Sequence, residues 1–287
     1  MGMIMVDRRQ KLVEIFEDTQ RFYSQNPQLA KAVQVAKDTA KLYEADDYPI
    51  ILSSERYDCQ ITVTKHKSFE AAMMIHVDHP EWKIAVLNFA SATNPGGGVK
   101  TGSSAQEESL CRCSTLYSTL TQSWLWQKYY TVNRAAQDNL HTDACIYSPG
   151  IVICKTDDDY PERMEEKDWV TVDVISCAAP NLRQRPGNIH NPEFGKAKKL
   201  GRDELYSLHL KRAKHIMHVS AANGADALIL GAFGCGAFAN DPITVAEAYD
   251  EALKEYRQYF RLIEFAIYCR PNETGNYDAF KREMTRN

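Results

Sequence analysis

The stretch KIAVLNFASATNPGGGVKTGSSAQEESL, Lys83 to Leu110, joins an apolar run to the start of a helical pattern through an unusual loop. The run KIAVLNFA has the length and composition of a buried β-strand. The loop then carries Gly96, Gly97 and Gly98 in a row, which is costly in backbone entropy and adds no side chain. Such a backbone needs positive φ angles or close approach to another group. The stretch therefore predicts a strand-to-helix turn against which another group lies.

From about residue 50 onward, apolar runs alternate with amphipathic helical patterns, as in QITVT, SFEAAMMIHV, ALILGAF and LIEFAIYC. This alternation is typical of an α/β domain with a largely parallel sheet. Between Arg8 and about Tyr43 the apolar residues recur at helical spacing, and Asn26-Pro27 breaks the pattern into two helices. We therefore expect an N-terminal helical accessory segment, residues 1–48, followed by one α/β domain, residues 49–287.

The composition excludes some classes of protein. The chain has 287 residues, 44% of them hydrophobic, and a formal net charge of -4, which argues against a general nucleic-acid binder. No stretch approaches the roughly 18 to 20 apolar residues of a membrane span. Eight cysteines without a C-x-x-C pair indicate reduced thiols in a cytoplasmic protein. Cys111 and Cys113 make a poor zinc pair, because i, i+2 side chains on a helix point to different faces.

A second glycine cluster, GAFGCGAF from Gly231 to Phe238, follows the apolar run ALIL. Ligands of open α/β sheets bind at the carboxyl ends of strands, and successive backbone N–H groups before a helix form an anion cradle. Two such loops predict a diphosphate held from both sides. No G-x-x-x-x-G-K-[ST] motif is present, which excludes a P-loop NTPase, and no acidic residue follows at the spacing of a Rossmann site.

The combination of GGG, seven residues and QEE in VLNFASATNPGGGVKTGSSAQEESLCRCSTLY resembles the signature of microbial-type poly(ADP-ribose) glycohydrolases, a branch of the macrodomain fold. IYSPGIVICKTDDD, VDVISCAAPN and LILGAFGCGAFANDP resemble that family too, in the expected order, so the resemblance covers about residues 50 to 285. It implies a three-layer α/β/α macrodomain-like fold with a mixed sheet. It further implies ADP-ribose or poly(ADP-ribose), free or attached to protein, as the ligand, with no metal or cofactor.

The resemblance also implies roles for single residues. Glu108 would be the catalytic acid/base, Glu107 would orient the distal ribose, and Gln106 would support the loop. Phe238 would pack beside the distal ribose or the diphosphate. The remaining binding residues would be Asn94, Gly96, Gly97, Gly98, Val99, Gly231, Ala232, Gly234, Cys235, Gly236 and Ala237. Whether Asn88 or Asn94 contacts the ribose stays open, and the candidates for stacking adenine are Phe89, Phe233, Tyr277 and Phe280.

The chemistry is consistent with this assignment. A ribosyl bond breaks through an oxocarbenium-like transition state when a carboxylic acid protonates the leaving oxygen, and the same group can then activate water. A pair of carboxylates flanking the bond needs a separation of about 5 to 9 Å. Glu107 and Glu108 diverge by roughly 100° at a helix start, so we assign them different roles. The alternative is that both acids only complement the helix dipole, and the two glycine loops favour catalysis over it.

The lead hypothesis is thus a glycosidase that cleaves ribose–ribose bonds and releases ADP-ribose. Removal of single ADP-ribose groups from protein or nucleic acid, and non-catalytic ADP-ribose reading, are the alternatives. Two further patterns receive structural interpretations. Asp157 to Asp159 are expected at a solvated hairpin tip, because a calcium loop would need a glycine and a distal glutamate. His209, His215 and His218 are expected on a solvated or partly packed helix face.

Overall fold

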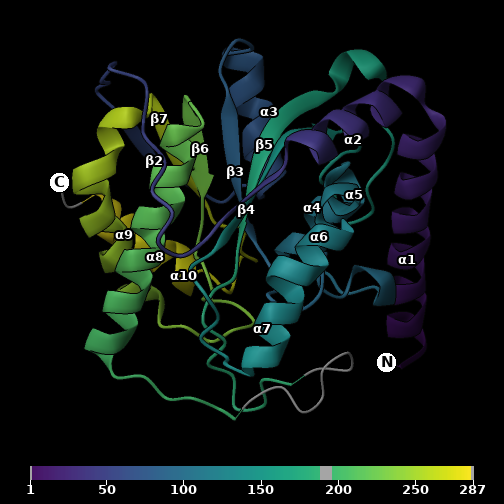
Figure 1. Ribbon diagram of the computed structural model, residues 1–287. Helices are drawn as coiled ribbons and strands as arrows, with labels where there is room; N and C mark the ends of the chain where they lie inside the picture. Colours follow the sequence, from purple (N-terminus) through teal and green to yellow (C-terminus); the bar gives the residue numbers. More distant parts are fainter. Residues whose placement is uncertain (1, 188–195, 286–287) are drawn as a thin grey trace.

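A single seven-stranded sheet forms the centre of the protein (Figure 1). The computed structural model describes residues 2–187 and 196–285. The strand order is β1-β4-β5-β3-β6-β7-β2. The bounds are β1 Lys41–Tyr43, β2 Gln60–Thr64, β3 Ile84–Phe89, β4 Cys145–Ile153, β5 Val170–Cys177, β6 Ala227–Leu230 and β7 Leu262–Ala266. β5, β3, β6, β7 and β2 run parallel, whereas β4 pairs antiparallel with both β1 and β5.

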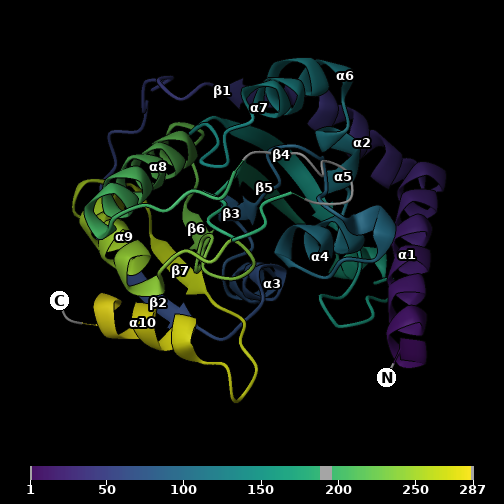
Figure 2. The same ribbon diagram turned by 90° about the horizontal axis from the view of Figure 1, so that it is seen from below.

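Helices cover both faces of this sheet (Figure 2). α8 (Arg202–Ala222), α9 (Pro242–Tyr256) and α10 (Gly275–Met284) pack with one core cluster, and α3 (Ser68–Asp78), α4 (Gln106–Cys113) and α5 (Leu116–Leu120) pack with the other. Within β3, Ala85 and Leu87 point into the first cluster, while Ile84 and Val86 point into the second. This alternation is what a strand buried on both faces produces. The predicted three-layer α/β/α organisation with a mixed sheet is confirmed.

The helical pattern that follows the first glycine loop does not form one continuous helix but several shorter ones. After α4 and α5 come α6 (Ser123–Leu125), the π-helical turn η2 (Trp126–Tyr130) and α7 (Thr131–Ala136). The first break has a clear cause: Ser114 is extended and forms a β-bridge with Ile153, and the N–H groups of Cys154 and Lys155 both donate to the carbonyl of Cys113. The end of β4 therefore takes the hydrogen bonds that would continue the helix. The 3-10 turns are η1 (Val99–Thr101), η3 (Glu166–Asp168) and η4 (Arg257–Tyr259).

The N-terminal segment forms the expected two helices, α1 (Gly2–Gln25) and α2 (Pro27–Thr39). Asn26 separates them, and its side chain accepts hydrogen bonds from the N–H groups of Gln28 and Leu29 as an N-cap. The helical pattern ends sooner than expected, because β1 adds to the sheet edge beside β4. The division into residues 1–48 and 49–287 stays a prediction, while β1 shows that the first part contributes to the sheet.

Ion pairs attach α1 to the loop after β4. Lys155, only 1% exposed, lies with its Nζ 2.8 Å from Asp18 and donates to the carbonyl of Ile15 at 3.0 Å. Arg163 also donates to Asp18, and this hydrogen bond is the main reason that the pKa of Asp18 falls to about 2. A buried lysine needs such partners, because an unpaired ammonium away from water is costly. This cluster therefore fixes α1 against the rest of the molecule.

Asp157 is not at a solvated tip as expected. The side chain is 8% exposed and accepts hydrogen bonds from the N–H of Phe69 at 3.3 Å and the hydroxyl of Ser109 at 3.1 Å. The turn folds back, so that Asp157 meets the first turns of α3 and α4. Burial raises the pKa of Asp157 from 3.8 to about 6, against the opposing effect of Lys67.

This raised pKa predicts a pH-dependent stability. As pH rises from about 4 to 6 the unfolded chain releases the Asp157 proton first, so the wild type loses free energy of unfolding over that window. Asp157→Asn carries no such proton. We expect the difference in unfolding free energy between Asp157→Asn and wild type to increase by about 2–3 kcal/mol across the window, measured by urea denaturation. The exposed Asp159→Asn serves as the control, and a pH-independent difference for Asp157→Asn would contradict the argument.

Candidate active site

A cavity of about 910 Å³ lies where the loops after β3 and β6 meet. Most of the predicted binding residues line it: Asn94, Gly97, Gly98, Gln106, Glu107 and Glu108 from the first loop and α4, and Ala232, Gly234, Gly236, Ala237 and Phe238 from the second loop. The sheet topology explains this meeting, because β3 and β6 are adjacent parallel strands whose carboxyl ends share one edge. The carboxyl edge of the sheet is also where the sequence placed the site.

Four predicted residues are not among those that line the cavity. A β-carbon on Gly96 would lie 2.7 Å from the ring of Tyr117, and Val99 is 1% exposed in the core. A β-carbon on Gly231 would lie 2.7 Å from the ring of Phe89. Cys235 packs against the core cluster behind the second loop, and burial raises the pKa of its thiol. These four residues shape the loops through packing.

Gln106 fastens the start of α4 to the end of β3. Its Oε1 accepts the N–H of Phe89 at 2.8 Å, and its Nε2 donates to the carbonyl of Leu87 at 2.7 Å and to the hydroxyl of Ser68 at 3.0 Å. The Gln106 side chain thus forms hydrogen bonds with the Phe89 N–H and the Leu87 carbonyl, as a neighbouring strand would do. This arrangement holds the two following glutamates at a fixed distance from the sheet edge.

Glu107 is 3% exposed, and both of its carboxylate oxygens have partners. Oε2 accepts the N–H of Ser91 at 2.8 Å, and Oε1 accepts Nδ2 of Asn88 at 3.4 Å. Burial and then the charge of Glu108 raise its pKa well above the usual range, while these donors oppose the shift. Asn88 is fully buried and also donates to Ser176, so it orients Glu107 from behind.

Glu108 differs from its neighbour in having one oxygen free. Oε1 accepts the N–H of Gly98 at 2.8 Å. Oε2 is buried and has no hydrogen-bond partner within the part of the chain that the structure describes. A buried carboxylate oxygen without a hydrogen-bond partner costs free energy. A ligand group that forms a hydrogen bond with this oxygen, or exchanges a proton with it, would recover part of that cost. The side chain lines the cavity, which gives that oxygen access to a ligand.

The glycines accommodate these carboxylates. Gly97 has φ +57°, and a β-carbon there would lie 2.4 Å from Oε1 of Glu108. The N–H groups of Gly97 and Val99 donate to the carbonyls of Asn94 and Gly96 within tight turns. The expectation that this loop offers its N–H groups to a diphosphate is therefore corrected for Gly97, Gly98 and Val99, because all three donors are used inside the protein.

The second loop has the free donors instead. The N–H groups of Gly234, Gly236, Ala237 and Phe238 donate to no acceptor among the described residues, and all four residues line the cavity. A β-carbon on Gly236 would meet no atom within 4 Å, so the backbone faces open space there. Several N–H groups converging on a cavity form a site for an anion.

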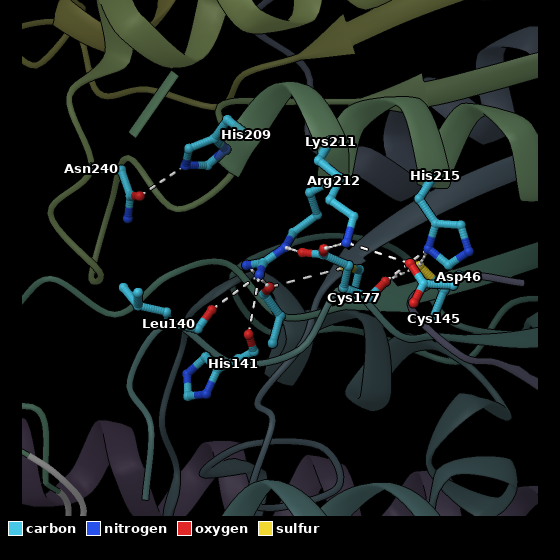
Figure 3. Close-up of polar contacts among 12 residues, drawn as sticks. Asp46, Leu140, His141, Cys145, Cys177, His209, Lys211, Arg212, His215 and Asn240 are labelled. Atoms are coloured by element: carbon cyan, nitrogen blue, oxygen red, sulfur yellow. Dashed lines mark hydrogen bonds and ion pairs between the residues drawn. The ribbon is translucent and has the colours of Figure 1, made fainter. Parts of the chain in front are cut away.

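Asn240 fixes the shape of this second loop (Figure 3). Its Nδ2 donates to the carbonyls of Pro180, Gly234 and Phe238 at 2.7, 3.0 and 3.2 Å. Its Oδ1 lies 2.8 Å from Nε2 of His209. His209 was expected on a solvated or partly packed helix face, but it is fully buried. Burial lowers the pKa of His209 to about 4, so the ring is neutral at pH 7 and its Nε2–H donates to Asn240.

A buried arginine holds the neighbouring wall (Figure 3). Arg212 is fully buried and forms an ion pair with Asp143 at 2.8 Å. Its guanidinium also donates to the carbonyls of Ala178 at 2.7 Å and Leu140 at 3.0 Å. These bonds join α8 to the backbone beside His141, which lines the cavity. His215, one turn further along, is fully buried as well and lies with Nδ1 2.8 Å from the carbonyl of Asp143.

The structure places the residues of several alternatives that the sequence left open. Asn94 lines the cavity, with its Oδ1 bonded to Arg134, whereas Asn88 lies behind Glu107. Of the stacking candidates, Phe89 lines the cavity, Phe233 and Phe280 are core residues, and Tyr277 only packs against the core. The sequence patterns missed further lining residues. Except for Arg112 in α4, they come from other parts of the chain: Arg8, Arg9, Leu12, His66, Lys67, Arg112, His141, Asn181, Arg183, Tyr268, Arg270 and Asn276. Among the described residues, no three His, Cys, Asp or Glu side chains gather as a metal site.

A family model described as the catalytic domain of microbial-type PARG matches residues 10–156. The chain belongs to this family. The match includes the glycine loop, both glutamates and β4, and it begins within α1. A comparison with curated protein sequences gives no match. None of the helices in the described part of the chain has the length and apolar character needed to cross a membrane.

Solved structures agree with the family. The poly(ADP-ribose) glycohydrolase of Thermomonospora curvata is 26% identical, with a TM-score of 0.79 over 96% of this chain and 99% of that chain. The same enzyme bound to the inhibitor ADP-HPD gives 27% identity and a TM-score of 0.77 over 95% and 99%. The Deinococcus radiodurans enzyme in complex with ADP-ribose is 32% identical, with a TM-score of 0.72 over 88% and 96%.

The hydrogen bonds of Asn240 predict that this residue is important for stability. Asn240→Ala removes the side-chain donor shared by three carbonyls and the acceptor of the buried His209, so we expect the free energy of unfolding to fall by about 2–4 kcal/mol. Urea denaturation measures this loss. Asn276→Ala, which also changes a cavity-lining asparagine but removes no such network, is expected to stay within about 0.5 kcal/mol of wild type. Equal stability of the two variants would contradict the role of Asn240.

Proposed function

We propose that the protein hydrolyses ribose–ribose O-glycosidic bonds of poly(ADP-ribose) and releases ADP-ribose. The observation that carries the proposal is the unpartnered Oε2 of Glu108, buried in a cavity whose opposite loop presents free N–H groups. Membership of the family, and neighbours that bind ADP-ribose or ADP-HPD, support the same substrate. The macrodomain-type sheet edge brings the two loops together.

Hydrogen-bond donors in the cavity would position the substrate. The diphosphate of ADP-ribose would accept the free N–H groups of Gly234, Gly236, Ala237 and Phe238, which have no other acceptor in the described chain. The ring of Phe238 lies beside that loop, where it can pack on the distal ribose. The Cζ atom of Arg183 lies 5.4 Å from the centroid of this ring. The distal ribose would then face the first turn of α4, which carries Glu107 and Glu108.

Glu108 would act as both acid and base. Its free Oε2 delivers a proton to the oxygen that leaves the anomeric carbon, and the resulting carboxylate then removes a proton from water as it attacks that carbon. The N–H of Gly98 holds the other oxygen throughout, so the carboxyl group keeps its orientation. The bound diphosphate can offset positive charge that develops on the sugar. One carboxyl group thus serves both halves of the reaction.

Glu107 would have a different role. Because the Ser91 N–H and Asn88 already bind its two oxygens, it is a fixed acceptor that can take hydrogen bonds from ribose hydroxyls. Its raised pKa follows from burial beside Glu108. This separation agrees with the sequence argument that neighbouring helix residues cannot flank one bond. We also propose a cytoplasmic location, which is supported by eight free cysteines, six of them buried.

Glu108→Gln tests the mechanism directly. The amide keeps the size of the side chain and can still accept the Gly98 N–H, but it cannot transfer a proton. We expect kcat for poly(ADP-ribose) to fall by about 10² to 10⁴, while calorimetry gives an ADP-ribose Kd close to that of wild type. Glu70→Gln, in the first turn of α3 and not among the residues lining the cavity, is the matched control and should keep full activity.

The outcomes separate the candidate functions. Turnover by Glu108→Gln equal to wild type would overturn the mechanism. ADP-ribose binding by wild type without turnover of any ADP-ribose glycoside would favour a reader. Release from mono-ADP-ribosylated protein but not from the polymer would favour the mono-ADP-ribosyl hydrolase.

Gly97→Ala tests the fit between the loop and Glu108. A left-handed φ costs an alanine about 1 kcal/mol or more, and the new β-carbon would displace Oε1 of Glu108, 2.4 Å away. We therefore expect kcat to fall by about 10²-fold or more, because a misplaced acid loses most of its effect. Gly275→Ala, where a β-carbon meets nothing within 4 Å, should be neutral in the same assay. Full activity of Gly97→Ala would show that the loop adapts.

A further inference from the structure

Of the arginines that line the cavity, Arg8, Arg9 and Arg112 carry charges that the proposed proton transfer does not use. Arg8 and Arg9 come from α1 and are exposed, whereas Arg112 comes from α4 and is 2% exposed. Within the described residues, no carboxylate lies in ion-pair range of any of the three; elsewhere on α1, Lys11 lies 4.0 Å from Glu14 and Arg21 lies 4.0 Å from Glu17. Unpaired cations facing a cavity are candidates for binding an anion.

Close packing fixes this basic wall. A β-carbon on Gly102 would lie 2.4 Å from the carbonyl oxygen of Arg9, so the loop runs directly against α1. Arg112 donates to the carbonyl of Ser103 at 2.7 Å, and its own carbonyl accepts the hydroxyl of Thr19 at 2.6 Å. α1, the loop and α4 therefore form one unit. The basic wall is defined here as Arg8, Arg9 and Arg112.

The basic wall is close to the catalytic carboxyl group. Burial lowers the pKa of Arg112, Glu108 raises it, and the charge of Arg8 lowers it again, so both residues act on the same guanidinium. Two cations near each other cost free energy unless an anion lies between them. Glu108 offsets part of this cost, and the exposed Arg8 and Arg9 remain available to a ligand in the cavity.

The basic wall and the free N–H groups of the second loop lie on different sides of the glutamates. The second loop follows β6 in the middle of the sheet, whereas α1 stands at the outer side beyond α4 in both views (Figures 1 and 2). One diphosphate is already assigned to the second loop. The basic wall therefore fits a second anionic group, located beyond the bond that Glu108 would cleave.

The polymer supplies such a group. In poly(ADP-ribose) the oxygen released from the anomeric carbon belongs to the ribose of the next nucleotide, and that ribose also carries the next diphosphate. We propose that Arg8 and Arg9, backed by Arg112, bind the diphosphate of the leaving nucleotide and so favour polymer over substrates with uncharged leaving groups. This inference rests on the proposed function and extends it from the bond to the substrate class.

The experiment compares two leaving groups. Arg8→Glu/Arg9→Glu is assayed with poly(ADP-ribose) and with 1″-O-(4-nitrophenyl) ADP-ribose, whose leaving group carries no phosphate. For the polymer we expect KM to rise about tenfold or more with kcat nearly unchanged, because charge reversal repels a diphosphate. For the aryl substrate both constants should stay within about twofold of wild type. Arg8→Lys/Arg9→Lys, which keeps the charge, should restore most of the polymer KM.

Lys11→Glu/Arg21→Glu is the matched control. It makes the same change of net charge on exposed positions of α1, but neither residue lines the cavity, so its polymer KM should equal that of wild type. Thermal melting confirms that all variants are folded. An unchanged polymer KM in Arg8→Glu/Arg9→Glu, or an equal rise for both substrates, would overturn the inference alone. Absence of turnover of both substrates by wild type would overturn the proposed function as well.

Discussion

The contact between the Glu108 carboxylate and the backbone of Gly97 and Gly98 is the constraint on which the site depends. A hydrogen bond of 2.8 Å from Gly98 orients one carboxylate oxygen, and the absence of a β-carbon on Gly97 leaves room for it. Any side chain at Gly97 would occupy the position of that oxygen. The Glu108 carboxyl group therefore requires a glycine at position 97. The residue has a positive φ, which glycine adopts readily, and it lacks the β-carbon that would clash with the carboxylate.

The two glycine loops have different functions despite their similar composition. In the first, the donors of Gly97, Gly98 and Val99 are used up by turns and by Glu108, so it presents a carboxyl group and few free N–H groups. In the second, turns use only some donors, and Asn240 binds carbonyls. Cavity-lining residues of this loop therefore keep N–H groups that have no acceptor among the described residues. An amide side chain that binds carbonyls can fix a loop without consuming its N–H donors, and this is what an anion site requires.

Sequence patterns predicted most of the fold because the strands are buried on both faces and their apolar runs are easy to recognise. They also placed both loops at one sheet edge, because the carboxyl ends of parallel strands lie at the same edge. They failed where a long-range contact overrides a local pattern. Ser114 lies within a helical pattern, but a β-bridge to Ile153 at the end of β4 keeps it extended. Asp157 was expected to be solvated, but it is buried against the start of α3, where it accepts the N–H of Phe69. His209 is polar but buried, and only the position of Asn240 explains it.

The basic wall was missed for a related reason, since Arg8 and Arg9 lie in an exposed helical pattern about 100 residues before Glu108. What brings them to the cavity is the buried cluster around Lys155, which binds Asp18 and the carbonyl of Ile15. Burying a lysine is costly unless its partners are fixed, so this cluster positions α1 with little freedom. A helix held in this way is part of the site. The cavity has N–H donors at the second loop and carboxyl groups on α4, and the basic wall beside them is complete only when α1 is in place.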